Sequence, residues 1–251
     1  MKINDACVAC KRCIPYCPVE AIKSDEKERN VWIEYDECVE CNACYRSGVC
    51  KVGALEQENL SWPRSIRVEL SDPAWKSSTT SGLGRGTSEM KTNDVTGKFK
   101  RGEVGFGVEF GRPGTGAQLS DVQIFTRLLC QANIGVRFAK KNPTTFLIEN
   151  IETGDFRQDV LQERVLTIIV EFAVKSEYLK EVLEIMEATA FKVDTVFSIS
   201  MITKAGEDES IRNAEIVRDL GYTVGEGTKV NIGIGRPAYT GSWEYEEEAA
   251  Q

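Results

Sequence analysis

The chain has 251 residues, a formal net charge of −8 and no histidine. Charged residues make up 28% and hydrophobic residues 41%, which is a globular composition and argues against wholesale disorder. The negative charge argues against nucleic-acid binding, which requires a basic face. The lack of histidine excludes imidazole as a general base, a haem ligand or a member of a Ser-His-Asp triad.

Eight of the nine cysteines lie within the first fifty residues, in two runs of similar form. Each run has three cysteines at every third position and a fourth a few residues later. The runs are Cys7, Cys10, Cys13 and Cys17, followed by Pro18, and Cys38, Cys41, Cys44 and Cys50. Thiolates are soft ligands, and C-x2-C-x2-C spacing lets one loop wrap around an iron–sulfur cluster. The spacing therefore predicts iron–sulfur chemistry.

Zinc and disulfides are the alternatives for these cysteines. A triple C-x2-C-x2-C followed by Cys-Pro is unusual for a tetrahedral zinc site. An odd cysteine count and the lack of a signal peptide disfavour disulfides. The second run departs from the first, with five residues instead of three before Cys50 and Lys51 in place of a proline, so the geometry around Cys50 is an open question.

With these motifs, residues 1–58 resemble the two-cluster bacterial ferredoxins. The resemblance implies two 4Fe-4S clusters with crosswise ligation, in which the fourth cysteine of each run binds the other cluster. The implied ligand sets are Cys7, Cys10, Cys13 and Cys50 for the first cluster, and Cys38, Cys41, Cys44 and Cys17 for the second. We expect this ferredoxin-type domain to span residues 1–60, with a hairpin formed by residues 21–23 and 31–35.

Residues 61–103 follow as a connecting region. Ser65–Leu70 alternates in hydrophobicity and predicts a strand, and residues 71–103 are rich in Gly, Ser, Thr and Lys. A loop of this length is either a connector or a functional loop that binds a partner or covers a cofactor. Its glycines do not form a dinucleotide fingerprint, because no strand precedes them and no helix follows.

Residues 104–240 show two rounds of strand and helix patterns. Strands are predicted at residues 104–110, 136–138, 145–149, 165–172, 191–201 and 229–235. Helices are predicted at Ser120–Asn133, directly after Ser176 and at residues 210–220. Ser120 and Gln123 are predicted to form a capping box for the first helix, and Ser176 to cap the second. The fold class is therefore α+β, and we expect an antiparallel split βαβ sandwich of the ferredoxin-like or ACT-like type.

Three further features complete the chain. Gly-Arg-Pro turns at Arg112 and Arg236 could contact an anion, but we favour simple turns, because only the first copy precedes a helix. Cys130, the ninth cysteine, is predicted to be a small buried side chain, not a ligand. Residues 241–251 form an acidic tail.

The combined pattern favours an electron-transfer protein, as the ferredoxin-like subunit of a larger anaerobic oxidoreductase. Its expected partners are a redox protein or oxidoreductase subunits, with homo-oligomerisation open. The alternative is a redox-linked regulatory module whose ACT-like domain binds a small metabolite. An enzyme is disfavoured, because no nucleophile–base pair, phosphate loop or nucleotide fingerprint occurs. We expect a cytoplasmic location without membrane segments, because no signal region and no run of about 18 apolar residues occur.

Overall fold

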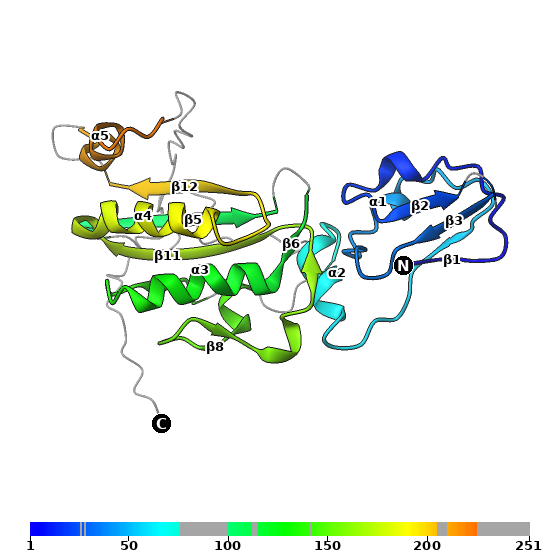
Figure 1. Cartoon of the computed structure of the whole chain (residues 1–251), viewed down its shortest axis with the longest axis horizontal. Coiled ribbons are helices and arrows are strands. Elements are labelled where there is room, and N and C mark those ends of the chain that lie inside the picture. Colours follow the sequence, from blue (N-terminus) through cyan, green and yellow to red (C-terminus); the bar gives the residue numbers. More distant parts are fainter. Residues whose placement is uncertain are drawn as a thin grey trace, which may run out of the picture.

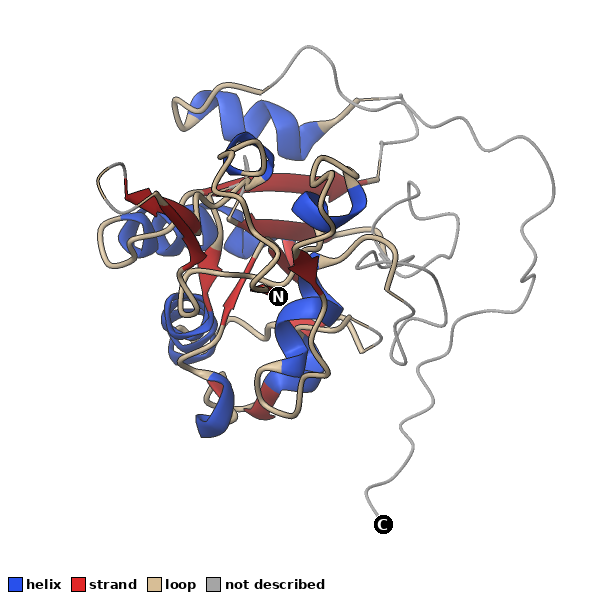
Figure 2. Ribbon diagram, turned by 90° about the vertical axis from the view of Figure 1, so that its right-hand side faces the viewer, coloured by secondary structure: helices blue, strands red, loops and turns tan. Residues whose placement is uncertain are grey.

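The computed structural model describes residues 1–75 and 100–224, apart from residues 26, 28, 112–114, 141 and 205–209. Figure 1 shows an N-terminal module at one end of the molecule and a sheet domain at the other, with helix α2 between them. Figure 2 looks along the long axis with the module facing the viewer. The turns at Arg112 and Arg236, the predicted strand at 229–235 and the acidic tail lie outside the described residues.

The N-terminal module is built from two short antiparallel pairs. β1 (Lys2–Ile3) pairs with β4 (Leu55–Glu56), which joins the two ends of the module. β2 (Ile22–Asp25) pairs with β3 (Asn30–Ile33), so the predicted hairpin is confirmed. One helical turn lies near each cysteine run: a 3-10 turn at Ile14–Tyr16 and α1 (Ala43–Arg46). The module buries few apolar side chains, which are Met1, Ala21, Ile22, Val31, Val39, Ala54 and Leu55.

The predicted strand at Ser65–Leu70 is wrong, because these residues form helix α2 (Ser65–Ser71). Ile66, Val68 and Leu70 are buried as the alternation suggested, but Arg67 and Ser71 are buried as well. A helix enclosed on most sides has no polar face, so hydrophobic alternation cannot separate it from a strand. The α2 helix packs against β10 (Arg164–Val165), which pairs with β6 (Ala117–Gln118).

The main sheet has four strands in the order β12, β5, β11, β7, and all neighbouring strands are antiparallel. The strands are β5 (Glu103–Phe110), β7 (Arg137–Phe138), β11 (Ile168–Lys175) and β12 (Phe197–Thr203). Helix α3 (Leu119–Gln131) follows β5, and α4 (Leu179–Ala190) follows β11, as Figure 1 shows. For the strands of the main sheet and these two helices, the order along the chain is strand, helix, strand, strand, helix, strand, and the domain is a mixed α/β structure.

The core of the sheet domain is aromatic. Alternate residues of β5 carry large apolar side chains, among them Phe106 and Phe110, which are fully buried. Phe106 stacks on Phe172 with ring centroids 5.3 Å apart, and Phe125 of α3 lies 5.6 Å from Phe110. The helices thus cover the sheet with the apolar faces that their sequences predict.

Several predicted boundaries and caps differ from the structure. Helix α3 begins at Leu119, and the Gln123 side chain accepts a hydrogen bond from the Phe156 amide (2.9 Å), so the capping box is absent. Ser176 opens a 3-10 turn before α4, and its hydroxyl accepts from Asn213 (3.1 Å). Residues distant in sequence form hydrogen bonds with the side chains that local capping would use.

The remaining elements show smaller shifts. The strand predicted at 145–149 is a 3-10 turn at Thr145–Leu147 followed by β8 (Ile148–Asn150), which pairs with β9 (Asp155–Phe156). The strand predicted at 191–201 begins only at Phe197. The last predicted helix is α5 (Arg212–Asp219).

Candidate iron–sulfur site

The two cysteine runs adopt the same unusual backbone. Ala9 and Lys11 in the first run and Glu40 and Asn42 in the second all have positive φ, between 51° and 59°. These residues occupy equivalent positions, 31 residues apart. A left-handed residue between two cysteines turns the chain sharply and directs backbone amides to the inside of the loop, where they can face an anionic cluster. The repeat in the sequence is therefore also a repeat in conformation.

Four of the cysteines surround one cavity. Cys7, Cys10, Cys13 and Cys50 line it, with walls of apolar side chains that include Ile3, Val31, Ala54 and Leu55. Burial raises the pKa of the Cys13 thiol, and the nearby Cys7, Cys10 and Cys50 raise it further. Cys50, although separated from the others in sequence, thus lies with the first run.

The other four cysteines lie around the second run, where Cys41 is buried. Burial raises the pKa of Cys44 to about 11, and the neighbouring Cys41 and Cys17 add to the shift. Burial also raises the pKa of Cys41, with a further contribution from Cys17. For Cys38, burial and then the Glu40 carboxylate raise the pKa to about 12. Cys17 therefore lies with the second run.

Cys17 and Cys50 have matching surroundings, although the second run has two more residues before its fourth cysteine. The Ala21 amide donates to Cys17 Sγ (3.1 Å), and the Ala54 amide donates to Cys50 Sγ (3.2 Å). Burial works against ionisation of Cys50, but hydrogen bonds from the backbone amides of residues 52–55 outweigh it and lower its pKa. Such N–H···S contacts stabilise thiolates. The altered spacing before Cys50 is absorbed by α1 and leaves the environment of Cys50 like that of Cys17.

This donor set fits iron–sulfur clusters. Buried thiols with raised pKa values resist ionisation, so the thiolate form requires a cation that compensates the charge. The described residues contain no group of three Cys, Asp or Glu side chains close enough to hold a single metal ion. A 4Fe-4S cluster instead takes one thiolate on each iron, so its ligands stand around a cavity, as the first four cysteines do.

Two buried arginines of the α2 region hold the second run from outside. Arg67 Nη1 donates to the carbonyls of Asp36 (2.8 Å) and Cys38 (2.9 Å), while its Nε donates to Glu163 Oε2 (2.5 Å) of the sheet domain. Arg64 donates to Glu40 Oε1 (2.7 Å) and lies over the ring of Tyr35. Sequence reasoning missed both arginines because it placed this segment in a strand.

Asp72, just after α2, completes this support. Its carboxylate accepts hydrogen bonds from Asn42 Nδ2 (2.8 Å) and from Arg46, and Arg46 also donates to the Cys41 carbonyl (2.7 Å). An ion pair between Arg164 and Glu37 adds a second direct link from the sheet domain to this run. The second cysteine run is thus connected to the rest of the protein through several charge-assisted hydrogen bonds.

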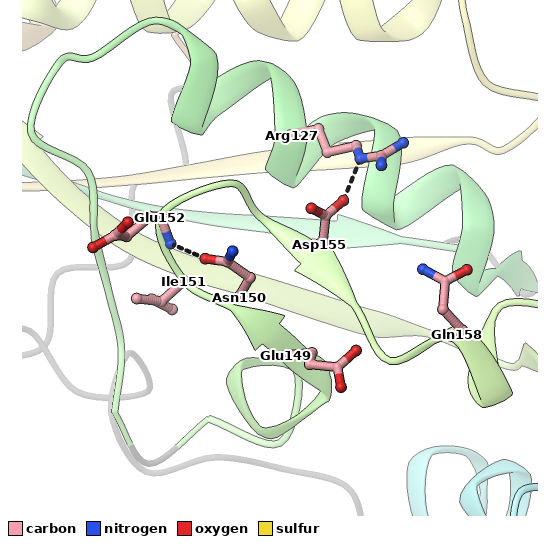
Figure 3. A pocket seen from close by; sticks show the side chains of 7 residues that line it. All are labelled: Arg127, Glu149, Asn150, Ile151, Glu152, Asp155 and Gln158. Carbon is pink, nitrogen blue, oxygen red and sulfur yellow. Dashed lines mark hydrogen bonds and ion pairs between the residues drawn. The ribbon is translucent and has the colours of Figure 1, made fainter.

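The sheet domain contributes no cysteine to these groups. Cys130 is half-buried, and its thiol donates to the Ile151 carbonyl at 3.6 Å. Nearby, a polar depression is lined by Arg127, Glu149, Asn150, Ile151, Glu152, Asp155 and Gln158 (Figure 3). Arg127 pairs there with Asp155 at 2.5 Å, and the Glu152 amide donates to the Asn150 side chain at 3.0 Å.

Comparisons with known proteins find one family model and several curated relatives. The family model of the 4Fe-4S binding domain matches residues 1–23. A ferredoxin of Rickettsia felis is 30% identical over 82 residues, covering 31% of this chain and 72% of that protein. An uncharacterized protein from the rpl9–rpl11 intergenic region of Porphyra purpurea is 26% identical over 70 residues, covering 26% of this chain and 93% of that protein.

A third relative is an enzyme subunit. The pyruvate synthase subunit PorD of Methanocaldococcus jannaschii is 40% identical over 52 residues, covering 21% of this chain and 57% of that protein. No solved structure matches the chain. None of the helices in the described part of the chain is both long and apolar enough to cross a membrane.

Proposed function

This chain belongs to the ferredoxin family, and on that premise we propose that it passes single electrons through two 4Fe-4S clusters as a subunit or partner of a larger oxidoreductase. The matching N-terminal segment is an iron–sulfur electron-transfer segment. The observation that carries the two-cluster proposal is the conformational repeat, because both cysteine runs have left-handed residues at equivalent positions.

The proposed ligands follow the grouping of the thiols. Cys7, Cys10, Cys13 and Cys50 hold the first cluster, and Cys38, Cys41, Cys44 and Cys17 hold the second. The shared cavity supports the first set, and the influence of Cys17 on the pKa values of Cys41 and Cys44 supports the second. The clusters supply the redox chemistry, while the chain supplies thiolates, N–H···S hydrogen bonds and exclusion of water.

The proposed role of the sheet domain is to dock the electron-transfer module to a partner. We assign residues 1–60 to the module and residues 104–240 to a split βαβ domain, a proposal supported by its strand order and by the strand–helix–strand–strand–helix–strand succession. Residues 61–103 connect them and residues 241–251 form the tail. The relative named as a pyruvate synthase subunit supports an oxidoreductase complex as the partner.

Anoxic reconstitution of the full chain tests the cluster count. We expect about eight irons and eight sulfides per chain, and an electron paramagnetic resonance spectrum of the reduced protein with the splitting of two interacting clusters. Four irons, or zinc without sulfide, would contradict the proposal.

Alanine variants of Cys17 and Cys50 test the crosswise ligation. Cys17→Ala is expected to impair the cluster of the second run and Cys50→Ala that of the first, each with loss of up to four irons and of the spin interaction. Retention of eight irons and an unchanged spectrum in Cys50→Ala would show that Cys50 is not a ligand.

Anoxic affinity purification from the native host tests the subunit role. Co-purification of oxidoreductase chains in stoichiometric amounts is the expected result. Isolation of the chain as a lone homodimer would contradict the subunit role.

A second candidate function is metabolite-dependent regulation. A cavity of about 440 Å³ lies at one end of the sheet domain, and its lining combines the basic Arg101, Lys204 and Arg212 with the acidic Glu103 and Glu177. Because the basic side chains outnumber the acidic ones, the lining suits a small polar metabolite that carries an anionic group. A rise in melting temperature with carboxylate or phosphate metabolites, absent in Arg212→Ala, would support this role.

A further inference from the structure

The two cysteine runs differ most in their exposure to solvent. Cys10 is exposed, while its counterpart Cys41 is only 9% exposed. The neighbouring Val8 is 59% exposed, but the equivalent Val39 is 1% exposed. The difference arises because the α2 region and the sheet domain contact the second run through Arg64, Arg67, Asp72 and Arg164. The first run is therefore the more accessible point for electron exchange with another molecule.

The cavity of the first run has basic side chains in its lining, although the whole chain carries a formal charge of −8 and the exposed Asp5 lies two residues before Cys7. Lys11 and Arg12 line the cavity of the first four cysteines, and Lys51 directly follows Cys50. Arg12 and Lys51 are exposed, and Lys11 is half-buried. None of the described residues that line this cavity is acidic. We call Lys11, Arg12 and Lys51 the basic rim.

The second run has the opposite character. It carries the acidic residues Glu37 and Glu40, which pair with Arg164 and Arg64, while the exposed Asp36 has a counterpart in Asp5 of the first run. The basic rim is thus specific to the first cavity, because the equivalent positions of the repeat carry no basic side chain.

Apolar side chains lie between the charges of the rim. Val8 is 59% exposed and Val52 is 45% exposed, and both line the same cavity as the cysteines. An apolar centre with charged surroundings is the usual composition of a protein–protein contact surface. Long basic side chains around it would attract a partner with negative charge and orient it before contact.

We propose that the first cluster exchanges electrons with an acidic redox protein, which docks on the basic rim with its carboxylates and covers Val8 and Val52. In the exchange, the reduced cluster loses one electron and returns to its oxidised state, and the oxidised partner gains that electron. The reverse transfer conserves electrons in the same way. The second cluster, held by the α2 region, relays the electron within the protein. This inference rests on the proposed function, because it requires both clusters.

A gold electrode coated with a carboxylate-terminated monolayer serves as the probe for an acidic partner. Cyclic voltammetry of the anoxic holoprotein at low ionic strength gives the interfacial electron-transfer rate constant. We expect Arg12→Gln/Lys51→Gln to lower this rate constant by about tenfold, and Arg12→Glu/Lys51→Glu to lower it further. Added salt is expected to reduce the difference between the wild type and the variants, since it screens exposed charges.

The matched control is Lys180→Gln/Lys192→Gln, which removes the same charge from exposed positions of the sheet domain. Its rate constant is expected to equal that of the wild type. An equal loss in the control variant, or an equal rate on an ammonium-terminated monolayer, would overturn the docking proposal.

Three further outcomes separate this proposal from its premise. Fewer than about eight irons in the wild type would mean that it lacks two clusters. This result would overturn the proposed function and the docking proposal with it. Intact clusters in every variant with identical rate constants would overturn the docking proposal alone. Wild-type dimers that become monomers in Arg12→Gln/Lys51→Gln, measured by sedimentation, would identify a second copy of this chain as the occupant and would also overturn it.

Discussion

The two cysteine runs use the same spacing and the same left-handed backbone, yet one is open to solvent and the other is enclosed. Val8 and Val39 illustrate this at equivalent positions, with exposed fractions of 59% and 1%. The cause lies outside the repeat, in Arg67 and its neighbours, which connect the second run to the sheet domain. The comparison shows that two loops with the same spacing and backbone can differ in solvent exposure when only one of them is covered by another domain.

The largest expected effect is that of removing Arg67, which connects the second run to the sheet domain. Arg67→Ala would leave Glu163 and the carbonyls of Asp36 and Cys38 without their donor in a buried site, so we expect unfolding free energy to fall by about 3 to 5 kcal/mol. Anoxic urea unfolding, followed by the visible absorbance of the clusters, measures it.

Arg127→Ala is the control for this variant. Arg127 is 50% exposed in its pair with Asp155, whereas Arg67 is 4% exposed, so the control should cost less than about 1 kcal/mol. Equal losses for the two variants would mean that Arg67 does not hold the second run.

Thiol reactivity in the iron-depleted chain should also separate the runs. The pKa of Cys38 is raised to about 12 by burial, whereas backbone amides outweigh burial and lower that of Cys50. A raised pKa leaves less thiolate at pH 8, so Cys38 should be alkylated roughly a thousandfold more slowly than an ordinary cysteine and Cys50 faster than one. Both rates should rise with pH until each thiol is ionised.

Iodoacetamide labelling with mass spectrometry gives the order of reaction. Labelling in concentrated guanidinium is the internal control, because unfolding removes the differences in burial and all nine thiols should then react alike. Equal rates at Cys38 and Cys50 under native conditions would contradict the expected order.

The valine pair offers a smaller test at matched positions. Val39→Ala removes two buried methyl groups and should lower unfolding free energy by about 2 kcal/mol, while Val8→Ala should change it by less than about 0.5 kcal/mol. Both values come from urea unfolding under anoxic conditions. Similar costs at the two sites would show that the first run is also enclosed when the clusters are bound.

The smallest effect concerns the positions just before Ala21 and Ala54. Gly53 has φ of +67°, and a Cβ there would meet nothing within 4 Å, so Gly53→Ala tests backbone strain alone and should cost about 1 kcal/mol. Glu20 has φ of 54° at the equivalent position, so Glu20→Gly should instead stabilise the fold by about 0.5 kcal/mol. The same sign for both changes in urea unfolding would contradict the equivalence of the two positions.

Much of the iron–sulfur chemistry was predictable from the sequence because ligand spacing is a local property. The hairpin of the module and the apolar faces of α3 and α4 were predictable for the same reason, since each depends on residues within one or two turns. The strand predicted at residues 65–70 was wrong, because burial of α2 on most sides depends on the two domains that enclose it. The caps at Ser120 and Ser176 were wrong because Phe156 and Asn213, distant in sequence, determine how Gln123 and Ser176 are used.

The sequence by itself determined that eight cysteines occur as a repeat with the spacing of iron–sulfur ligands. Only the tertiary structure decided which copy is exposed. Arg67 meets Glu163 across 96 residues and Arg164 meets Glu37 across 127, and contacts of that range arise from the packing of the two domains, which no local pattern encodes. The difference in burial between the two cysteine runs follows from this packing, and so does the proposed point of electron exchange.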